Sequence, residues 1–166
     1  MGSISYLPSA AGNLTGLSKW PDTGSNYEKV SDYDYNTYVY TYSTIVVKDT
    51  YDFPNVSDLG VITSVVVSVT VAVYTGTGYA TPILRVGTTN YGSEQAIGSS
   101  YAIKSQTWTE NPATSSPWQW TDLDSAQIGV GLRTDDDSKN AICAFVQLTI
   151  NYRTPSGQVR FIGMAM

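Results

Sequence analysis

Tyrosines are concentrated in one short stretch of the chain, at Tyr33, Tyr35, Tyr38, Tyr40 and Tyr42. The last three alternate with other residues, so in a strand they share one face. A tyrosine side chain offers a large rigid ring with a hydroxyl at its tip, which suits sugars and protein interfaces equally well. The stretch therefore fits an outer sheet face with paired aromatic rings, a protein interface or a glycan-binding surface.

Two tryptophans, Trp118 and Trp120, end the uncharged segment "NPATSSPWQW" at residues 111–120. An extended backbone places both indoles on one side, where they either form a platform for a sugar or pack as a lid over the end of the fold. Because Trp is highly buried on average, we expect these indoles to be structural.

Alternating acidic residues offer a weak metal motif in "SDYDYN", at Asp32, Asp34 and Asn36. A helical calcium loop with this start also needs a glycine at its sixth position and an acidic residue at its twelfth. Those positions hold Thr37 and Ser43, so that motif is rejected. A calcium site that uses Asp32 or Asp34 together with backbone carbonyls stays open, and no other cofactor is expected.

Catalytic groups are scarce in this sequence. The chain has no His, which removes the usual general base and the commonest metal ligand. Glu28, Glu94 and Glu110 are available for acid and base roles, but none lies in a motif that identifies such a role. The three aspartates at 135–137 are expected at a solvated hairpin tip. We predict that the protein is not an enzyme.

Composition indicates one all-β domain. The chain has 166 residues, of which 14% are charged, and Thr, Ser, Gly and Tyr are abundant. A net charge of −5 disfavours nucleic-acid binding, and no stretch is apolar enough to predict a membrane span. The one cysteine, Cys143, forms no internal disulfide. The N-terminal residues lack the pattern of a secretory signal, which predicts synthesis in a host cytoplasm.

Alternating apolar residues predict the strands that position these groups. The clearest runs place on one face of a strand Val65, Val67, Val69, Val71 and Val73; Ile128, Val130 and Leu132; and Ile142, Ala144, Val146, Leu148, Ile150 and Tyr152. With the remaining runs they predict about 8 strands in a jelly-roll or Greek-key β-sandwich. One short helical turn is expected in "TDLDSAQ", with Thr121 as its N-cap.

Three segments follow from this pattern. Residues 31–152 are expected to form the sandwich, and residues 1–30 an N-terminal arm packed on it. Residues 153–166 are expected to be a tail that forms an edge strand or contacts another subunit. The apolar residues proposed for assembly are Tyr6, Leu7 and Trp20 in the arm, Tyr38, Tyr40 and Tyr42 in the sandwich, and Phe161, Ile162, Met164 and Met166 in the tail.

The order of short motifs resembles that of a known family over roughly residues 8–152. These motifs are "PSAAGNLTG", "GSNYEKV", "DYDYNTYVYT", "LGVITSVVVSVTV", "TPILRVGTTNYGS", "TWTENPATSSPWQWTDLDSAQIGVGL" and "AFVQLTINY". Together they resemble β-sandwich domains of tailed-virus particle proteins, whose jelly roll is similar to carbohydrate-binding modules. The resemblance implies a structural role without a known activity, and "RFIGMAM" at the end of the chain is outside it.

This resemblance, together with the absence of a catalytic motif, implies a non-enzymatic structural protein of a virus particle, either a capsid decoration protein or a fibre subunit. Its expected partners are copies of itself in a homo-trimer, the major capsid protein or other virion proteins, and surface glycans. Nucleic acid and membranes are not expected as partners. The alternative is a carbohydrate-binding module that attaches a larger assembly to glycans, which would present exposed aromatic rings in a row or groove.

Overall fold

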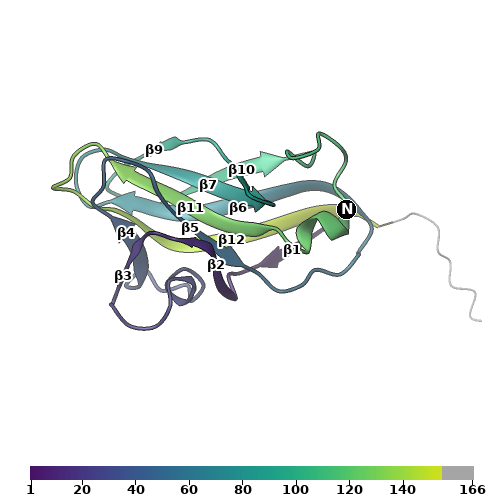
Figure 1. The fold of residues 1–166 in the computed structure, drawn as a ribbon, viewed down its shortest axis with the longest axis horizontal. Helices are drawn as coiled ribbons and strands as arrows, with labels where there is room; N and C mark the ends of the chain where they lie inside the picture. The colour runs from purple at the N-terminus through teal and green to yellow at the C-terminus, as the bar shows by residue number, and fades with distance from the viewer. Residues whose placement is uncertain (155–166) are drawn as a thin grey trace, which may run out of the picture.

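The computed structural model describes residues 1–154, which form two packed antiparallel sheets (Figure 1). Within these residues, no helix is long and apolar enough to cross a membrane. The strands are β1 (Gly2–Tyr6), β2 (Ala10–Thr15), β3 (Ser18–Trp20), β4 (Tyr38–Thr41), β5 (Val47–Asp52), β6 (Val61–Val73), β7 (Gly78–Val86), β8 (Thr89–Tyr91), β9 (Gln95–Ile97), β10 (Ala102–Trp108), β11 (Gln127–Thr134) and β12 (Ala141–Arg153). Two single-turn 3-10 helices, η1 (Tyr27–Val30) and η2 (Trp120–Leu123), complete the elements.

The first sheet runs in the order β10-β6-β12-β4-β3. Strand β12 is long enough for two partners along one edge, so β4 pairs with its first residues and β1 with its last. The second sheet runs in the order β2-β5-β11-β7-β8, and β9 also pairs with β7. The predicted β-sandwich is confirmed, and its long central strands β6 and β12 provide a broad first sheet.

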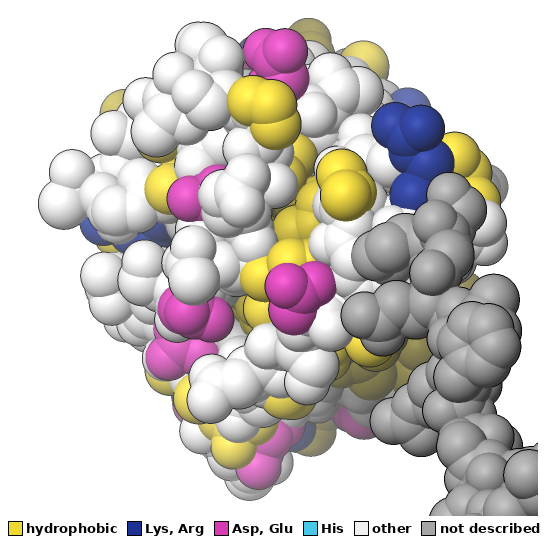
Figure 2. Space-filling view, turned by 90° about the vertical axis from the view of Figure 1, so that its right-hand side faces the viewer, with side chains coloured by type: hydrophobic (Ala, Val, Ile, Leu, Met, Phe, Trp, Pro, Cys, Tyr) yellow, Lys and Arg dark blue, Asp and Glu magenta, His cyan; other side chains and the backbone are white. Residues whose placement is uncertain are grey.

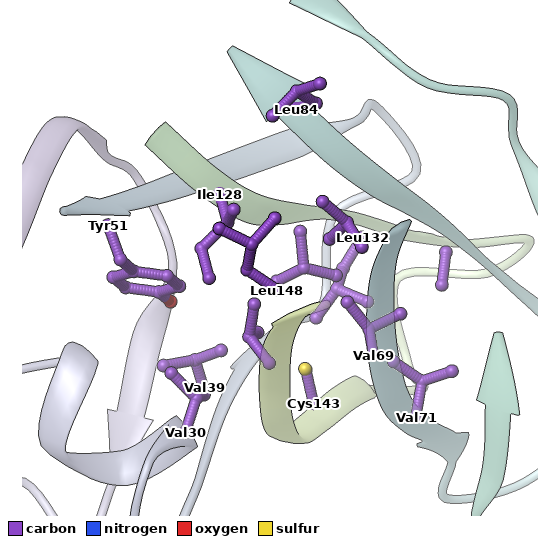
Figure 3. Packing of buried hydrophobic residues seen from close by; sticks show 14 of the residues in the cluster. Val30, Val39, Tyr51, Val69, Val71, Leu84, Ile128, Leu132, Cys143 and Leu148 are labelled. Atoms are coloured by element: carbon purple, nitrogen blue, oxygen red, sulfur yellow. The ribbon is translucent and has the colours of Figure 1, made fainter. Parts of the chain in front are cut away.

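The core lies between the sheets and follows the predicted alternation (Figure 3). In β6 the alternating valines from Val65 to Val73 are fully buried, as are Ile128, Val130 and Leu132 of β11. Side chains on one face of a strand point the same way, so the residues between these valines face outward. The outward residues of β6 form part of the outer face of the first sheet.

One predicted face is wrong at the start of β12. Cys143 pairs with Val71 and Phe145 with Thr70, so Ala144 is an extra residue in a β-bulge. A bulge shifts the alternation by one residue. Ile142 therefore lies opposite Tyr40 on the outer face, while Val146, Leu148 and Ile150 point into the core as predicted. Phe145 lies on the outer face, two residues before Gln147, as the inward facing of Val146, Leu148 and Ile150 implies.

The first 30 residues are part of both sheets rather than an arm packed on a finished sandwich. Strand β1 pairs with β12, β2 with β5 and β3 with β4. These strands are short and rich in Gly and Ser. Backbone hydrogen bonds hold them in the sheets, and their sequences contain no apolar run that would predict a strand. They bring the number of strands to 12, above the expected 8.

The helical turn is present where the sequence predicts one, but it begins before Thr121. Helix η2 starts at Trp120, and the backbone N–H of Gln119 donates to Asp122 Oδ2 at 2.8 Å. Gln119 is therefore the N-cap, in a reciprocal arrangement with Asp122. The other helical turn, η1, lies in a segment without apolar periodicity, so the sequence does not predict it.

The free thiol of Cys143 gives a simple test of the core. Cys143 is fully buried, and burial raises the pKa of its thiol to about 12. A thiolate is the reactive form, so we expect no reaction with a thiol reagent at neutral pH in the native protein. In denaturant the reagent should modify one thiol per chain, and fast modification of the native protein would contradict this packing.

Candidate ligand-binding face

Four adjacent strands, β10, β6, β12 and β1, form a broad part of the outer face of the first sheet. None of the outward residues that pair across the central part of these strands is charged. Strand pairing places these residues side by side on it: Ser3 and Ser5 of β1, Ser64, Val66, Ser68 and Thr70 of β6, Ile103, Ser105 and Thr107 of β10, and Phe145, Gln147, Thr149 and Asn151 of β12. A large uncharged sheet face suits a neutral polar ligand better than an anion or a nucleic acid.

Hydroxyl and amide groups on this face are linked across the strands. Ser68 Oγ and Ser105 Oγ share a hydrogen bond of 2.8 Å, and Ser5 Oγ and Thr149 Oγ1 share one of 3.0 Å. Asn151 Nδ2 donates to Ser64 Oγ at 2.9 Å. Each hydroxyl has two acceptor sites and a donor, so these groups retain capacity for a ligand. We call these six residues with Gln147 the hydroxyl strip.

Beside the hydroxyl strip the face is hollowed by a cavity of about 190 Å³. Tyr33 and Phe145 form one wall, with ring centroids 4.1 Å apart and planes tilted by 35°. Tyr35 and Ile103 also line the cavity, and Tyr33, Tyr35 and Ile103 are 64%, 59% and 70% exposed. We call these four side chains the aromatic pocket. They combine exposed apolar area with a formed hollow, which is typical of ligand sites.

The bulge at Ala144 and a strained loop together build the aromatic pocket. Tyr33 has φ 58°, a left-handed conformation that is uncommon for a bulky side chain. Asp32 holds the loop, because its Oδ1 accepts the Asp34 N–H at 3.0 Å and its Oδ2 accepts the Thr37 hydroxyl at 2.6 Å. Such strain persists only where the surroundings enforce it, and it is concentrated at functional sites.

Tyr101 supports the pocket from the end of β10. Its ring lies 4.9 Å from that of Tyr35, and its hydroxyl donates to the Tyr35 carbonyl at 3.2 Å. Burial, followed by the nearby Tyr38 hydroxyl, raises the pKa of Tyr101 to about 12. The hydroxyl therefore stays protonated and keeps this hydrogen bond at all ordinary pH values.

The predicted row of Tyr38, Tyr40 and Tyr42 is present on the outer face, toward the edge of the sheet. Successive rings meet edge to face at 6.0 and 5.6 Å. Burial and the two neighbouring tyrosines raise the pKa of Tyr38. Trp20 of β3 pairs with Tyr38 and is 55% exposed. The three rings thus form a continuous edge-to-face row along β4 and the residue that follows it. Their contact with another subunit stays a prediction.

The two tryptophans of the 111–120 segment are structural, as expected. Trp118 is 3% exposed, and its Nε1 donates to the Trp108 carbonyl at 3.1 Å. Trp120 is half-buried, its Nε1 donates to the Gly60 carbonyl, and its ring meets that of Tyr152 at 6.0 Å. Both N–H groups are used within the fold, so these indoles close the end of the sandwich.

The weak metal candidates do not form a cluster. Among the residues that the structure describes, no group of three or more His, Cys, Asp or Glu side chains is placed to hold a metal ion. Asp32 braces the loop, and Asp34 Oδ1 accepts the N–H and Nδ2 of Asn36 at 2.9 and 2.8 Å. Calcium binding at these two residues stays a prediction. The aspartates at 135–137 lie in the β11–β12 turn, where Lys139 contacts Asp135 at 3.2 Å.

The predicted assembly residues at the chain ends are placed only in part. Tyr6 is half-buried in β1 and meets Phe53 with ring centroids 6.2 Å apart, and Leu7 is also half-buried. Phe161, Ile162, Met164 and Met166 lie outside the described residues. No observation tests their role in assembly.

The end of the sandwich where β1 begins and β12 ends differs from the outer sheet face. Figure 2 shows apolar side chains in a hollow there, with acidic side chains around them. A cavity of about 240 Å³ at this end is lined by Asp52 and Asp124 together with Phe53 and Leu123. Its carboxylates disfavour acidic ligands, and it lacks the paired rings of the aromatic pocket.

Comparison with known proteins finds likeness in fold only. No protein-family model and no curated protein matches the chain. Among solved structures, a family 16 carbohydrate-binding module has 11% identity and a TM-score of 0.44, over 83% of this chain and 89% of that one. The N-terminal cellulose-binding domain of Cellulomonas fimi β-1,4-glucanase C has 14% identity and a TM-score of 0.43, over 93% and 90%.

A cyclase from Fischerella sp. in its apo form is equally similar, with 14% identity and a TM-score of 0.43, over 92% of this chain and 85% of that one. All three structures have TM-scores below 0.5 and identities below 15%. Fold likeness of this kind does not identify an activity, so we argue function from this chain's own residues.

Proposed function

We propose that this protein is a non-catalytic glycan-binding module and that its site is the outer face of the first sheet. The observation that carries the proposal is the continuity of the aromatic pocket with the uncharged hydroxyl strip. Phe145 and Thr70 are paired neighbours in the pocket, and the next outward pair along the same strands is Gln147 and Ser68 of the strip. Pocket and strip are thus one surface.

A sugar needs both kinds of contact that this surface offers. The C–H face of a pyranose ring is apolar and packs on aromatic rings, while its hydroxyls need donors and acceptors at the ring edge. The aromatic pocket supplies exposed rings, and the hydroxyl strip supplies groups that donate and accept. Because the strip is uncharged, its contacts depend on hydrogen bonds and contribute little salt dependence.

Retention on immobilised glycans tests this proposal. We expect the full chain to bind at least one polysaccharide class on a glycan array, and Gln147→Ala to weaken that binding about tenfold through loss of the strip's central amide. Gln147 is half-buried on the outer face, so the variant should fold normally. Absence of binding to every glycan would refute the proposal.

The expectation of a virion decoration or fibre subunit stays a prediction, together with a homo-trimer and capsid partners. Glycan binding is compatible with that role, because a particle protein can present a glycan-binding face. Nothing among the residues described here favours the virion role over attachment of any other assembly. We therefore propose the binding activity alone.

A further inference from the structure

One charged side chain stands in the wall of the otherwise neutral aromatic pocket. Asp34 lines the cavity together with Tyr33, Tyr35 and Phe145, and it is exposed. The side chains that line this cavity include no Lys or Arg, so a ligand inside meets an uncompensated carboxylate. A purely neutral sugar would not require that charge.

The Asp34 carboxylate has one oxygen that the loop leaves available. Both side-chain hydrogen bonds at this carboxylate, from the N–H and Nδ2 of Asn36, end on Oδ1. The bracing of the Tyr33 loop is supplied mainly by Asp32, which uses both of its oxygens. Among the described contacts, Asp34 Oδ2 accepts none, so it remains for a ligand.

Aromatic faces beside a carboxylate are the chemistry that recognises an ammonium group. A cation is attracted to the face of a tyrosine or phenylalanine ring, and a nearby carboxylate adds a charge-assisted hydrogen bond. This chain contains the same combination elsewhere: the Arg133 guanidinium lies 3.7 Å from the centre of the Tyr79 ring and pairs with Glu94 at 2.6 Å. The aromatic pocket offers rings and carboxylate without an internal cation.

We propose that the aromatic pocket selects a glycan that carries free amino groups, such as a chain of β-1,4-linked glucosamine. The protonated amine meets Asp34 Oδ2 while the sugar ring packs on Tyr33 and Phe145, and neighbouring sugars extend over the hydroxyl strip. This proposal rests on the proposed glycan-binding function. The net charge of −5 further favours a cationic polymer over a neutral or acidic one.

The test compares two probes that differ only at the amino group. Binding of a glucosamine hexamer and of its fully N-acetylated form to the full chain is measured by calorimetry at low and high salt. We expect the free-amine hexamer to bind about tenfold more tightly at low salt, and the preference to shrink at high salt because the charge contact is exposed.

The matched variant is Asp34→Asn, which keeps an acceptor for Asn36 and so preserves the loop. We expect it to bind both hexamers equally, at the affinity of the wild type for the N-acetylated form. If the wild type binds both hexamers equally and Asp34→Asn changes nothing, the amine preference is refuted while glycan binding stands. If neither hexamer nor any glycan on the array binds, the proposed function itself fails.

Discussion

We expect replacement of Phe145 with alanine to weaken the proposed glycan binding about 30-fold, the loss typical of truncating an aromatic side chain at the centre of a binding site. The ring forms the wall of the aromatic pocket and contacts Tyr33. Without it, Tyr33 loses its stacking partner and the ligand loses its apolar surface. Calorimetry on the best glycan of the array measures the change, and circular dichroism verifies the fold.

The matched control for this variant is Tyr74→Ala. Tyr74 is an aromatic residue with 78% exposure, and it does not line the aromatic pocket. Its removal should leave the dissociation constant unchanged. Equal losses in both variants would indicate nonspecific adhesion to exposed rings, and an unchanged constant in Phe145→Ala would place the site elsewhere.

Removing the buried carboxylate of Asp49 has the largest expected effect on stability. Asp49 is fully buried in β5. Its Oδ1 accepts the Leu17 N–H at 2.8 Å, and its Oδ2 accepts Asn26 Nδ2 at 2.6 Å and the Tyr51 hydroxyl at 3.1 Å. Asp49→Ala removes the acceptor of the Leu17 N–H and the Tyr51 hydroxyl and leaves Asn26 Nδ2 only the Leu17 carbonyl, so we expect the free energy of unfolding to fall by about 3 kcal/mol.

Urea unfolding of Asp49→Ala and Asp49→Asn separates the hydrogen bonds from the charge. The asparagine keeps one acceptor oxygen in place and should lose less stability than the alanine. An alanine variant as stable as the wild type would show that water replaces the carboxylate. That outcome would contradict the role of Asp49 in fixing the turn after β2 to the second sheet.

The same carboxylate gives a dependence on pH with a definite sign. Burial is the largest cause that raises the pKa of Asp49, and the hydrogen bonds from Leu17, Asn26 and Tyr51 oppose it. Since the folded pKa exceeds the unfolded one, the folded state holds the proton more tightly. This contribution to stability is present at low pH and is lost as pH rises through the raised pKa. In Asp49→Asn this component of the pH profile should vanish.

The core was predictable from sequence because alternation of apolar residues is a local signal. The five buried valines of β6 and the apolar residues of β11 follow a period of two without interruption. Burial of Trp118 followed from the size of its side chain. Each of these predictions depends on residues within one strand or one segment.

The aromatic pocket was not predictable, because it joins residues far apart in the chain. Tyr33 belonged to the tyrosine stretch, but its partner Phe145 is more than a hundred positions away, in β12. The bulge at Ala144 places Ile142 and Phe145 on the same outer face, and no residue type in this segment predicts a bulge. Every residue from Ile142 to Val146 is apolar, so alternation does not reveal the shift.

The pairing of Gly2 with Tyr152 brings the start of β1 beside the end of β12. Both ends of the described sandwich consequently lie at one pole (Figure 1), while Phe145 lies farther along β12 from that pole. A host protein that carried this unit between two points of a surface loop would need only a small opening to accommodate it. A host joined to both ends of this sandwich would therefore hold it at one pole, at a distance from the aromatic pocket.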